Sequence, residues 1–448
     1  MFTLPDEVKQ FMDTFRKSGY QIYVVGGAVR DLLLTNTTDD WDFTTNATPE
    51  EILKLYPDGF YNNQFGTVGI EIEVGGNKQI FEVTTFRKEG EYKDLRHPEK
   101  IEWAQTLEED LARRDFTINA IACDGNTIID PYNGQKHLTA KLIVTVGDPE
   151  KRFQEDALRL LRAIRIAAQL GFLIEEQTLD TIKRNAHLVT HIAWERIRDE
   201  LLKMIALANA ADALFFLRST TLLKYILPEL DECFSVEQKS PQRHHIYDVG
   251  THLVMSLKHC PSKDVVTRLA TLLHDIGKSK TYRKDPTSSI ITFHNHEVVG
   301  TQMAEKIADR LHLSNKQKDK LLTLIRYHQF TVSELQTDKA VRRFIRQVTK
   351  EYLQDMLDLR TGDRIGSGAK QTSWRLELFK KRLEEVQKQP FTVKDLKIDG
   401  HDVMKTLSLK PGPQIGNILE ELFDQVVEGK LPNEKEELLA KLAQKKTS

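Results

Sequence analysis

An apolar strand, a double-glycine turn and two spaced aspartates follow one another between residues 23 and 42, which read YVVGGAVRDLLLTNTTDDWD. Because side chains alternate across a strand, the spacing predicts Asp40 and Asp42 on one face and Trp41 on the other. Paired carboxylates on one face can hold two divalent ions ~3.5–4 Å apart, which stabilises the attacking and leaving oxygens in phosphoryl transfer. The pair therefore predicts a metal-dependent enzyme.

The residues before the aspartates suit a triphosphate. Gly26 and Gly27 allow the backbone to approach phosphate groups closely, and Arg30 can bind phosphate oxygens as a planar fork. An ordinary hairpin with a solvated acidic turn is the alternative for either motif alone. The two motifs together, with Asp40 nine residues after Asp31, favour a nucleotide site.

The composition is that of a globular protein that is too long for a single core. The chain has 448 residues, of which 40% are hydrophobic and 29% charged, and about three domains are expected at this length. No apolar run has transmembrane length, and the N-terminal MFTLPDEVKQ lacks the pattern of a secretory signal. Three widely separated cysteines indicate neither a disulfide framework nor a zinc site. We therefore expect a cytoplasmic protein, whose net charge of −2 neither supports nor excludes a nucleic-acid partner.

Helix and strand patterns divide the chain into four regions. Residues 1–135 alternate helix and strand signals, with strands expected near 67–70 and 79–85, and predict a mixed sheet with flanking helices. After the turn DPYNG the strand signals fade and helical periodicity continues to the end. We therefore expect an α+β fold, in which the head is followed by an all-α neck at 136–235, a histidine-rich region at 236–370 and a helical tail at 371–448.

Two further motifs carry charged side chains that suit a nucleotide. In DLARRDFTINA, Arg114 can bind phosphate oxygens and Asp115 can accept hydrogen bonds from a ribose, although an ion-paired turn before a strand would need the same residues. In EDALRLLRAIRIAAQLGF, Asp156 and Arg159 lie three residues apart on an expected helix and can present an acceptor beside a donor.

Such an acceptor and donor would select two bases. Cytosine and adenine place an amino donor beside a ring acceptor, whereas uracil and guanine reverse this polarity. Leaving a polar group unpaired in a closed site costs ~1–3 kcal/mol, which is enough for rejection. Arg162 and Arg165 come three and six residues after Arg159 on the same expected helix, and they can bind the phosphates of the nucleotide or of an RNA backbone. A helix with a surface salt bridge is the alternative reading of this segment.

Several segments of the first half together resemble the class II tRNA nucleotidyltransferases, the CCA-adding enzymes, which build the 3′ end of tRNA without a nucleic-acid template. These segments are GGAVRD with DWD, EGEYKDLRHP, RRDFTINA, DPYNG, EDALRLLRAIR and ERIRDEL. The resemblance covers roughly the first 205 residues and implies tRNA, ATP and CTP as partners and Mg²⁺ at the head. Trp41 replaces the usual aliphatic residue between the aspartates, and only a packing consequence is expected. The resemblance implies Asp40 and Asp42 as catalytic residues and magnesium ligands, and Glu82 as a third catalytic carboxylate. It implies Gly27, Arg30 and Arg114 for the triphosphate. It implies Asp156 and Arg159 for the base, with Arg162 and Arg165 nearby.

The second half of the chain resembles an HD phosphohydrolase domain. His252, the dipeptide His274–Asp275 and Asp363 match its metal ligands in order, and the auxiliary candidates are His294, His296 and His328. Imidazole and carboxylate ligands suit Mg²⁺, Mn²⁺ or Ni²⁺ rather than a structural zinc ion. The resemblance thus implies a second divalent metal and leaves open whether it serves a secondary phosphohydrolase activity.

These resemblances together predict a nucleotidyltransferase that adds C, C and A, with an HD domain and a helical tRNA-binding tail. Residues 86–100 are interpreted as a loop, and Arg96 and His97 within it favour addition of the terminal A, because relatives that add only CC look truncated there. An A-only adding enzyme and a poly(A) polymerase are alternatives of the same class. An HD phosphohydrolase whose head is only a binding module, and a non-catalytic RNA-binding protein, are alternatives of other classes.

Overall fold

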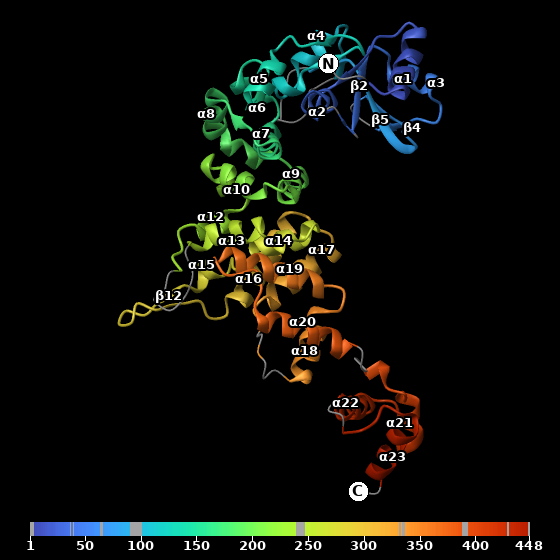
Figure 1. The fold of residues 1–448 in the computed structure, drawn as a ribbon, viewed down its shortest axis with the longest axis vertical. Helices are drawn as coiled ribbons and strands as arrows, with labels where there is room; N and C mark the ends of the chain where they lie inside the picture. Colours follow the sequence, from blue (N-terminus) through green and yellow to red (C-terminus); the bar gives the residue numbers. More distant parts are fainter. Residues whose placement is uncertain are drawn as a thin grey trace. The chain divides into compact units, whose positions relative to one another are not determined.

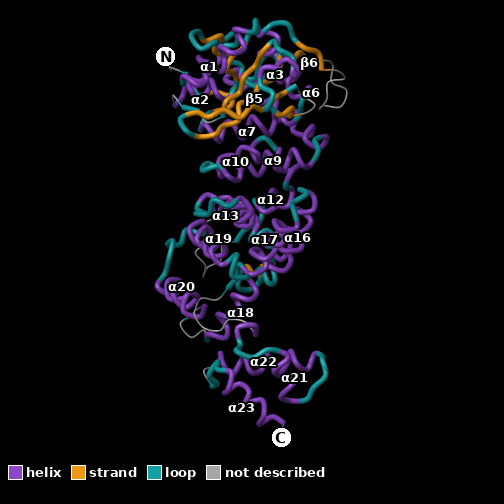
Figure 2. Tube along the Cα trace, turned by 90° about the vertical axis from the view of Figure 1, so that its right-hand side faces the viewer, coloured by secondary structure: helices purple, strands orange, loops and turns teal. Residues whose placement is uncertain are grey.

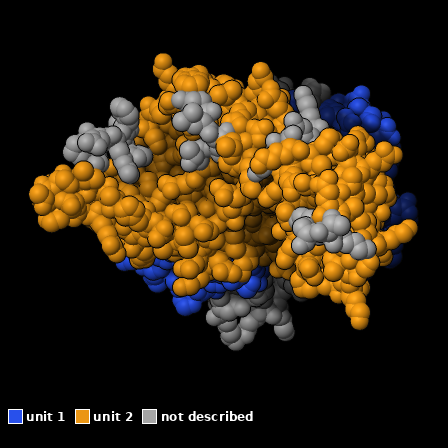
Figure 3. Space-filling view, turned by 90° about the horizontal axis from the view of Figure 1, so that it is seen from below, with its two compact units in different colours: residues 1–232, 307–312 blue, residues 233–306, 313–448 orange. Residues whose placement is uncertain are grey.

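The computed structural model describes residues 4–35, 37–38, 40–62, 66–89, 101–238, 247–330, 333, 337–387, 393–427 and 430–446. The chain forms two compact units, which Figure 3 colours separately: unit 1 comprises residues 1–232 and 307–312, and unit 2 comprises residues 233–306 and 313–448. The longer strands all belong to unit 1, whereas unit 2 is largely helical (Figure 2). Within the described ranges, no helix has both the length and the apolar composition to cross a membrane.

Unit 1 begins with a mixed sheet and its helices (Figure 1). Seven strands pair in the order β3-β4-β5-β2-β1-β8-β9; β2 and β5 run parallel, and the other neighbouring pairs run antiparallel. The predicted mixed sheet is thereby confirmed. The elements are α1 (Asp6–Lys17), β1 (Ile22–Val25), α2 (Gly27–Thr35), β2 (Trp41–Thr45), α3 (Pro49–Leu55), β3 (Phe60–Asn62), β4 (Thr67–Val74), β5 (Asn77–Thr85), β6 (Arg87–Glu89), β7 (Ile101–Trp103), α4 (Leu107–Ala112), β8 (Ala122–Cys123) and β9 (Ile128–Ile129).

The two faces of strand β2 have different neighbours. Trp41 and Phe43 are buried, and the ring centroid of Phe43 lies 4.9 Å from that of Phe11 on α1 and 5.1 Å from that of Phe81 on β5. Asp42 lies between them in the strand and lines a cavity instead. Trp41 therefore packs away from the carboxylates, as the alternation of the strand predicts.

The segment interpreted as a loop at 86–100 begins as a strand. Residues Arg87–Glu89 pair antiparallel with Ile101–Trp103, so the loop interpretation is wrong for 87–89. Three-residue strands are too short to give a periodic signal. Arg96 and His97 lie outside the described residues, and their role in adding the terminal A stays a prediction.

The neck of unit 1 is helical apart from one short pair of parallel strands, β10 with β11, which the all-α expectation missed.

The larger correction concerns Asp156, which was placed on a helix with Arg159. Helix α6 ends at Glu155, Asp156 is extended (φ −142°, ψ 104°), and α7 begins at Leu158, whose N–H donates to Asp156 Oδ1 at 3.0 Å. An aspartate that accepts from a backbone N–H in this way favours a position outside the helix. The neck elements are α5 (Gly134–Ala140), β10 (Leu142–Ile143), α6 (Pro149–Glu155), α7 (Leu158–Leu170), β11 (Leu173–Ile174), α8 (Glu176–Asn185), α9 (Trp194–Ala206), α10 (Ala210–Ser219), α11 (Leu222–Ile226) and α12 (Pro228–Cys233).

Unit 2 carries the histidine-rich region and the tail. The apolar stripe of α22 belongs to the core of the tail: Leu422 and Phe423 are buried in a cluster with Val403 of α21 and Leu438 of α23. The assignment of four domains stays a prediction. The elements are α13 (Val249–Lys258), α14 (Val265–Leu273), α15 (Lys278–Thr281), β12 (Arg283–Lys284), β13 (Ile291–Thr292), α16 (His296–Arg310), α17 (Asn315–Tyr327), α18 (Asp338–Val348), α19 (Leu353–Gly366), α20 (Trp374–Gln387), α21 (Gly400–Leu407), α22 (Pro413–Val427) and α23 (Lys435–Lys446).

Candidate active site and metal centre

A cavity of about 700 Å³ in unit 1 brings most of the predicted head residues together. Eight arginines and five aspartates line it, so its charge favours a polyanion such as a triphosphate. Glu82 is not in its lining. The charged lining residues are Arg30, Arg87, Arg113, Arg114, Arg159, Arg162, Arg165, Arg196, Asp31, Asp40, Asp42, Asp115 and Asp156.

The carboxylates of this cavity are arranged to take a cation. Burial, the Asp40 carboxylate and Glu82 raise the pKa of Asp42 to about 7, although Arg114 and Arg30 oppose the shift. Glu82 is the register partner of Asp42 on the parallel strand β5. Among the described residues, no hydrogen bond or ion pair reaches the carboxylate of Asp40 or Asp42. Crowded negative charge that nearby arginines offset only in part is the electrostatic environment that a divalent cation stabilises, so these residues fit Mg²⁺.

Gly26 makes room for the phosphate-binding side of the cavity. Its φ is +70°, and a Cβ there would lie 2.9 Å from Nη1 of Arg114 and 3.6 Å from Oδ2 of Asp42. Glycine satisfies this conformation without moving Arg114, whereas a Cβ at Gly27 would lie 3.5 Å or more from its neighbours. The stricter constraint therefore falls on Gly26, although Gly27 also lines the cavity.

Arg30, Asp115 and Arg162 belong to one hydrogen-bonded network rather than pointing freely into the cavity. Asp115 Oδ2 accepts from Nε of Arg162 at 2.8 Å, and its Oδ1 accepts from Nδ2 of Asn119 at 3.0 Å. Asn119 Oδ1 in turn accepts from Nη1 of Arg30 at 2.9 Å, and Asp31 accepts from Nε of Arg30 at 2.8 Å. Burial opposes ionisation of Asp115, but Arg162 and Asn119 hold the pKa of this carboxyl below its ordinary value. Asp115 thus ties helix α7 to the head.

Asp156 and Arg159 line the same cavity, but each has its own partner in this structure. Arg196 of α9 donates from Nη1 and Nη2 to the two oxygens of Asp156 at 3.2 and 2.9 Å. Arg159 is buried, and its Nη1 donates to Glu155 Oε2 at 2.7 Å. Arg165, the last predicted member, donates from Nε to Glu200 Oε2 at 2.6 Å.

The structure adds residues that sequence reasoning left without a role. Two of them, Asp110 and Arg113, come from the motif DLARRDFTINA: the fully buried Asp110 holds Arg113 at 2.6 Å and the predicted phosphate ligand Arg114 at 3.1 Å. Arg196 comes from ERIRDEL, a segment that supports the family resemblance but to which no site residue was assigned. No sequence pattern predicts a role for Arg87, because it lies in β6, a strand too short to give a periodic pattern.

In unit 2 the four predicted HD ligands meet at one point. Nε2 of His252 lies 3.3 Å from Nε2 of His274, 3.4 Å from Asp275 Oδ2 and 3.4 Å from Asp363 Oδ1. Nε2 of His274 lies 3.4 and 3.6 Å from the same two oxygens. Ligands held ~2.1 Å from a common ion are separated by ~3.4 Å in a tetrahedron and ~3.0 Å in an octahedron. The spacing therefore fits a divalent cation.

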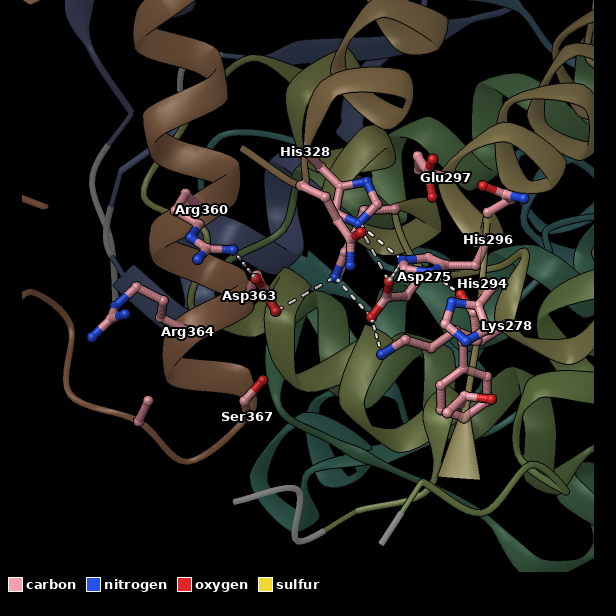
Figure 4. A pocket seen from close by; sticks show the side chains of 16 residues that line it. Asp275, Lys278, His294, His296, Glu297, His328, Arg360, Asp363, Arg364 and Ser367 are labelled. Carbon is pink, nitrogen blue, oxygen red and sulfur yellow. Dashed lines mark hydrogen bonds and ion pairs between the residues drawn. The ribbon is translucent and has the colours of Figure 1, made fainter. Parts of the chain in front are cut away.

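The surroundings of this point are also charged. Burial works against protonation of His274, but Asp275 and Asp363 raise the pKa of its imidazole to about 10. A divalent cation would take the place of that proton between the carboxylates. The adjoining cavity of about 530 Å³ is lined in part by Lys278, Arg360 and the exposed His294 (Figure 4). Both cations are ion-paired with the proposed ligands: Lys278 Nζ lies 2.6 Å from Asp275 Oδ2, and Arg360 Nη1 lies 3.2 Å from Asp363 Oδ2.

Three family models match the chain. They are described as the poly A polymerase head domain (residues 22–144), an RNA- and SrmB-binding site of polymerase A (171–234) and tRNA nucleotidyltransferase domain 2 (292–442). The first contains Asp40, Asp42 and Arg114, and the last contains Asp363.

Proteins named as CCA-adding enzymes match over part or all of the chain. One from Geobacillus kaustophilus is 46% identical over 213 residues, so that the chain spans about half of that relative, 52% of its length. One from Levilactobacillus brevis is 33% identical over 98% of both chains, and one from Ligilactobacillus salivarius is 31% identical over 97% of this chain and 96% of the relative.

Solved structures agree in fold. The CCA-adding enzyme of Bacillus stearothermophilus in complex with CTP is 28% identical, with a TM-score of 0.75 over 99% of this chain and 97% of that one. The Thermotoga maritima CCA-adding enzyme complexed with tRNA is 18% identical, with a TM-score of 0.61 over 99% and 96%, and shows likeness of fold alone. From its full-length relatives, the chain belongs to the family of CCA-adding enzymes.

Proposed function

We propose that this chain adds C, C and A to the 3′ end of tRNA, using CTP and ATP. The observation that carries the proposal is the cavity of unit 1 described above, which is lined by Asp40 and Asp42, by arginines and by the base-reading candidates Asp156 and Arg159. A cavity in which one pair of residues, Asp156 and Arg159, contacts the base suits an enzyme that accepts CTP and ATP in turn. A cytoplasmic location remains a prediction from the sequence.

The triphosphate would lie against the arginines of the cavity. Arg114 stands next to Gly26, where the backbone can approach phosphate oxygens closely. The N-terminus of α2 begins at Gly27 and offers backbone N–H groups to an anion. Arg162 and Arg165 line the same wall and suit phosphate oxygens of the nucleotide or the RNA.

In the reaction, the 3′-hydroxyl of the tRNA attacks the α-phosphorus of the nucleotide. The bond from this phosphorus to the bridging oxygen breaks, pyrophosphate leaves, and the hydroxyl proton passes to solvent. Mg²⁺ held by Asp40 and Asp42, with Glu82 beside them, would compensate the charge on the attacking and leaving oxygens. Asp156 would accept from the amino group of cytosine or adenine, and Arg159 would donate to the ring acceptor.

The proposal is tested with three tRNA transcripts, which end before CCA, at CC and at CCA. Each is incubated with one labelled nucleotide at a time. We expect two C residues and then one A on the first transcript, A alone on the second and nothing on the third. Addition of A only, or of an A tail to every transcript, would identify an A-adding enzyme or a poly(A) polymerase instead.

A second function is favoured by the HD ligands. We propose that His252, His274, Asp275 and Asp363 bind one divalent cation (Mg²⁺, Mn²⁺ or Ni²⁺) and that this site hydrolyses phosphate esters, with water added at phosphorus and the alcohol released. His274→Ala should remove this metal and any hydrolysis of model phosphate esters while CCA addition continues. Absence of both metal and hydrolysis in the unaltered chain would reduce the region to a scaffold.

A further inference from the structure

One row of paired residues crosses the sheet of unit 1 from the edge strand β3 to β2. Phe60 of β3 is the register partner of Gly69 on β4. Gly69 in turn pairs with Glu82 on β5, and Glu82 pairs with Asp42 on β2. The strands β4, β5 and β2 lie side by side in Figure 1. Because register partners project from the same face of a sheet, Phe60 lies on the face that carries the proposed metal ligands.

Glycine at position 69 lets the ring of Phe60 extend along this row toward Glu82. A Cβ at Gly69 would overlap Cζ of Phe60 and would lie 2.6 and 2.8 Å from Cε2 and Cε1 of the same ring. The backbone of Gly69 has no positive φ, so the approach of the ring, and not the conformation, is what requires glycine there. Adjacent strands are ~4.8 Å apart, so the outer edge of the ring stands about one strand from Glu82 and ~10 Å from Asp42.

The side chains beside Glu82 on this face are apolar and accessible. Phe60 is 49% exposed, and Ile80, two residues before Glu82 on β5, is 51% exposed. Ile80 projects from the same face as Glu82 because side chains two residues apart share a face of a strand. A phenyl ring and an aliphatic side chain next to a carboxylate suit a flat group that is apolar on its faces, such as a nucleic-acid base.

The triphosphate would lie on the other flank of β2. The neighbour of β2 on that flank is β1, and Gly26 directly follows β1. Nη1 of Arg114 stands close to Gly26, and Arg30 lines the same cavity. In phosphoryl transfer the attacking and leaving oxygens are roughly in line across the phosphorus. With pyrophosphate on the β1 flank, the attacking 3′-hydroxyl of tRNA comes from the β5 flank, on which Phe60 lies.

We propose that Phe60 stacks on the base of the nucleotide whose 3′-hydroxyl attacks, and so positions the end of the tRNA over the metal ligands. The inference rests on the nucleotidyl transfer proposed above and adds a contact with the primer. Every base has a π-face, so one phenyl ring can hold the tRNA end before CCA and also the C ends that follow. Phe60 is thus a positioning residue that does not read the sequence.

The first test measures addition of A to a tRNA transcript that ends at CC. Phe60→Leu should raise the KM for tRNA about tenfold, which corresponds to ~1.4 kcal/mol. The kcat and the KM for ATP should stay the same, because stacking holds the primer equally in the ground state and the transition state. Phe60→Tyr keeps the ring and should behave as the unaltered chain. Tyr61→Leu, at an equally exposed aromatic residue on the opposite face of β3, is the matched control and should keep the KM for tRNA.

The second test uses the same transcript with its terminal C made abasic. On the unaltered chain this transcript should have the KM that is about tenfold higher, and Phe60→Leu should raise the KM no further. An additional increase in the variant would show that Phe60 acts without the base and would overturn the inference. An abasic transcript that reacts with the unaltered chain as well as the complete one would also overturn it, even where Phe60→Leu fails to fold.

The outcomes separate this inference from the proposed function. An unchanged KM for tRNA in Phe60→Leu, with normal addition of A by the unaltered chain, would overturn the stacking contact alone. No addition of A by the unaltered chain would overturn the proposed function and the stacking contact with it.

Discussion

Arg196 of helix α9 holds Asp156 by both carboxylate oxygens, with Nη1 donating to Oδ1 at 3.2 Å and Nη2 to Oδ2 at 2.9 Å. Oδ1 also accepts from the N–H of Leu158 at 3.0 Å. A carboxylate offers about four lone-pair positions, so Asp156 can accept from the amino group of a base while Arg196 fixes its plane. We regard Arg196 as the residue that positions the acceptor.

Arg196→Ala should reduce discrimination between bases more than it reduces binding of tRNA. The carboxylate would keep its contact with Leu158 but lose the two-point contact that sets its plane. The ratio of kcat/KM for CTP over UTP should fall about tenfold, which corresponds to ~1.4 kcal/mol. Arg198→Ala, on the same helix but outside the cavity lining, is the control. An unchanged ratio in the Arg196 variant would show that the contact is structural only.

Asp156→Asn should weaken the preference for both CTP and ATP. Asparagine replaces one acceptor oxygen by a donor, so it can pair with the carbonyl groups of uracil and guanine. We expect misincorporation of U or G to rise at the expense of C and A, measured by competition between labelled nucleotides. The single change is preferred to exchange of Asp156 with Arg159, because Arg159 is buried beside Glu155 and a carboxylate there would face another carboxylate. Equal loss of all nucleotides would argue against base reading by Asp156.

Asp42→Asn should stabilise the metal-free chain at pH 8. Burial and Asp40 raise the pKa of Asp42 in the folded state from 3.8 to about 7. The folded state therefore binds a proton that the unfolded state releases between these two pKa values, and stability falls as pH rises through this window. The full effect is up to ~4 kcal/mol at ~1.36 kcal/mol per pKa unit.

Thermal unfolding without divalent ions measures this effect. The Tm of the Asp42→Asn variant should exceed that of the unaltered chain at pH 8, and the difference should vanish near pH 4. Added Mg²⁺ should raise the Tm of the unaltered chain more than that of the variant, because the ion stabilises the charged carboxylate. Asp58→Asn, at an exposed aspartate, should show neither trend. A variant less stable than the unaltered chain at pH 8 would contradict the electrostatic assignment.

The sequence predicted best where a short periodic pattern carries the chemistry. Alternation in strand β2 placed Trp41 and Asp42 on opposite faces, because the pleat of a strand leaves no other arrangement. The ordered ligands His252, His274, Asp275 and Asp363 also meet in space, although no spacing rule relates His252 to Asp363, which lies over a hundred positions further along the chain. Their proximity depends on the packing of α13, α14 and α19.

The sequence predicted less well where side chains compete for partners. The spacing of Asp156 and Arg159 predicts one continuous helix, but an aspartate tends to accept hydrogen bonds from backbone N–H groups outside a helix. The sequence pattern therefore does not show the break between α6 and α7. The partners Arg196 and Glu155 come from different elements, and pairwise spacing cannot show which side chain takes which partner.

Loss of nucleotide addition in Asp42→Ala is the most direct measurement on the proposed active site. Unaltered chain, Asp42→Ala and the surface control Asp58→Ala are incubated with a tRNA transcript that lacks CCA, with labelled CTP and ATP and with Mg²⁺, while tRNA affinity is measured in parallel. We expect Asp42→Ala to lose addition of both C and A by at least ~10³-fold while it binds tRNA as the unaltered chain does, because a ligand of the catalytic metals serves the chemical step. Near-normal addition of either nucleotide by Asp42→Ala would contradict the assignment of the active site to this cavity.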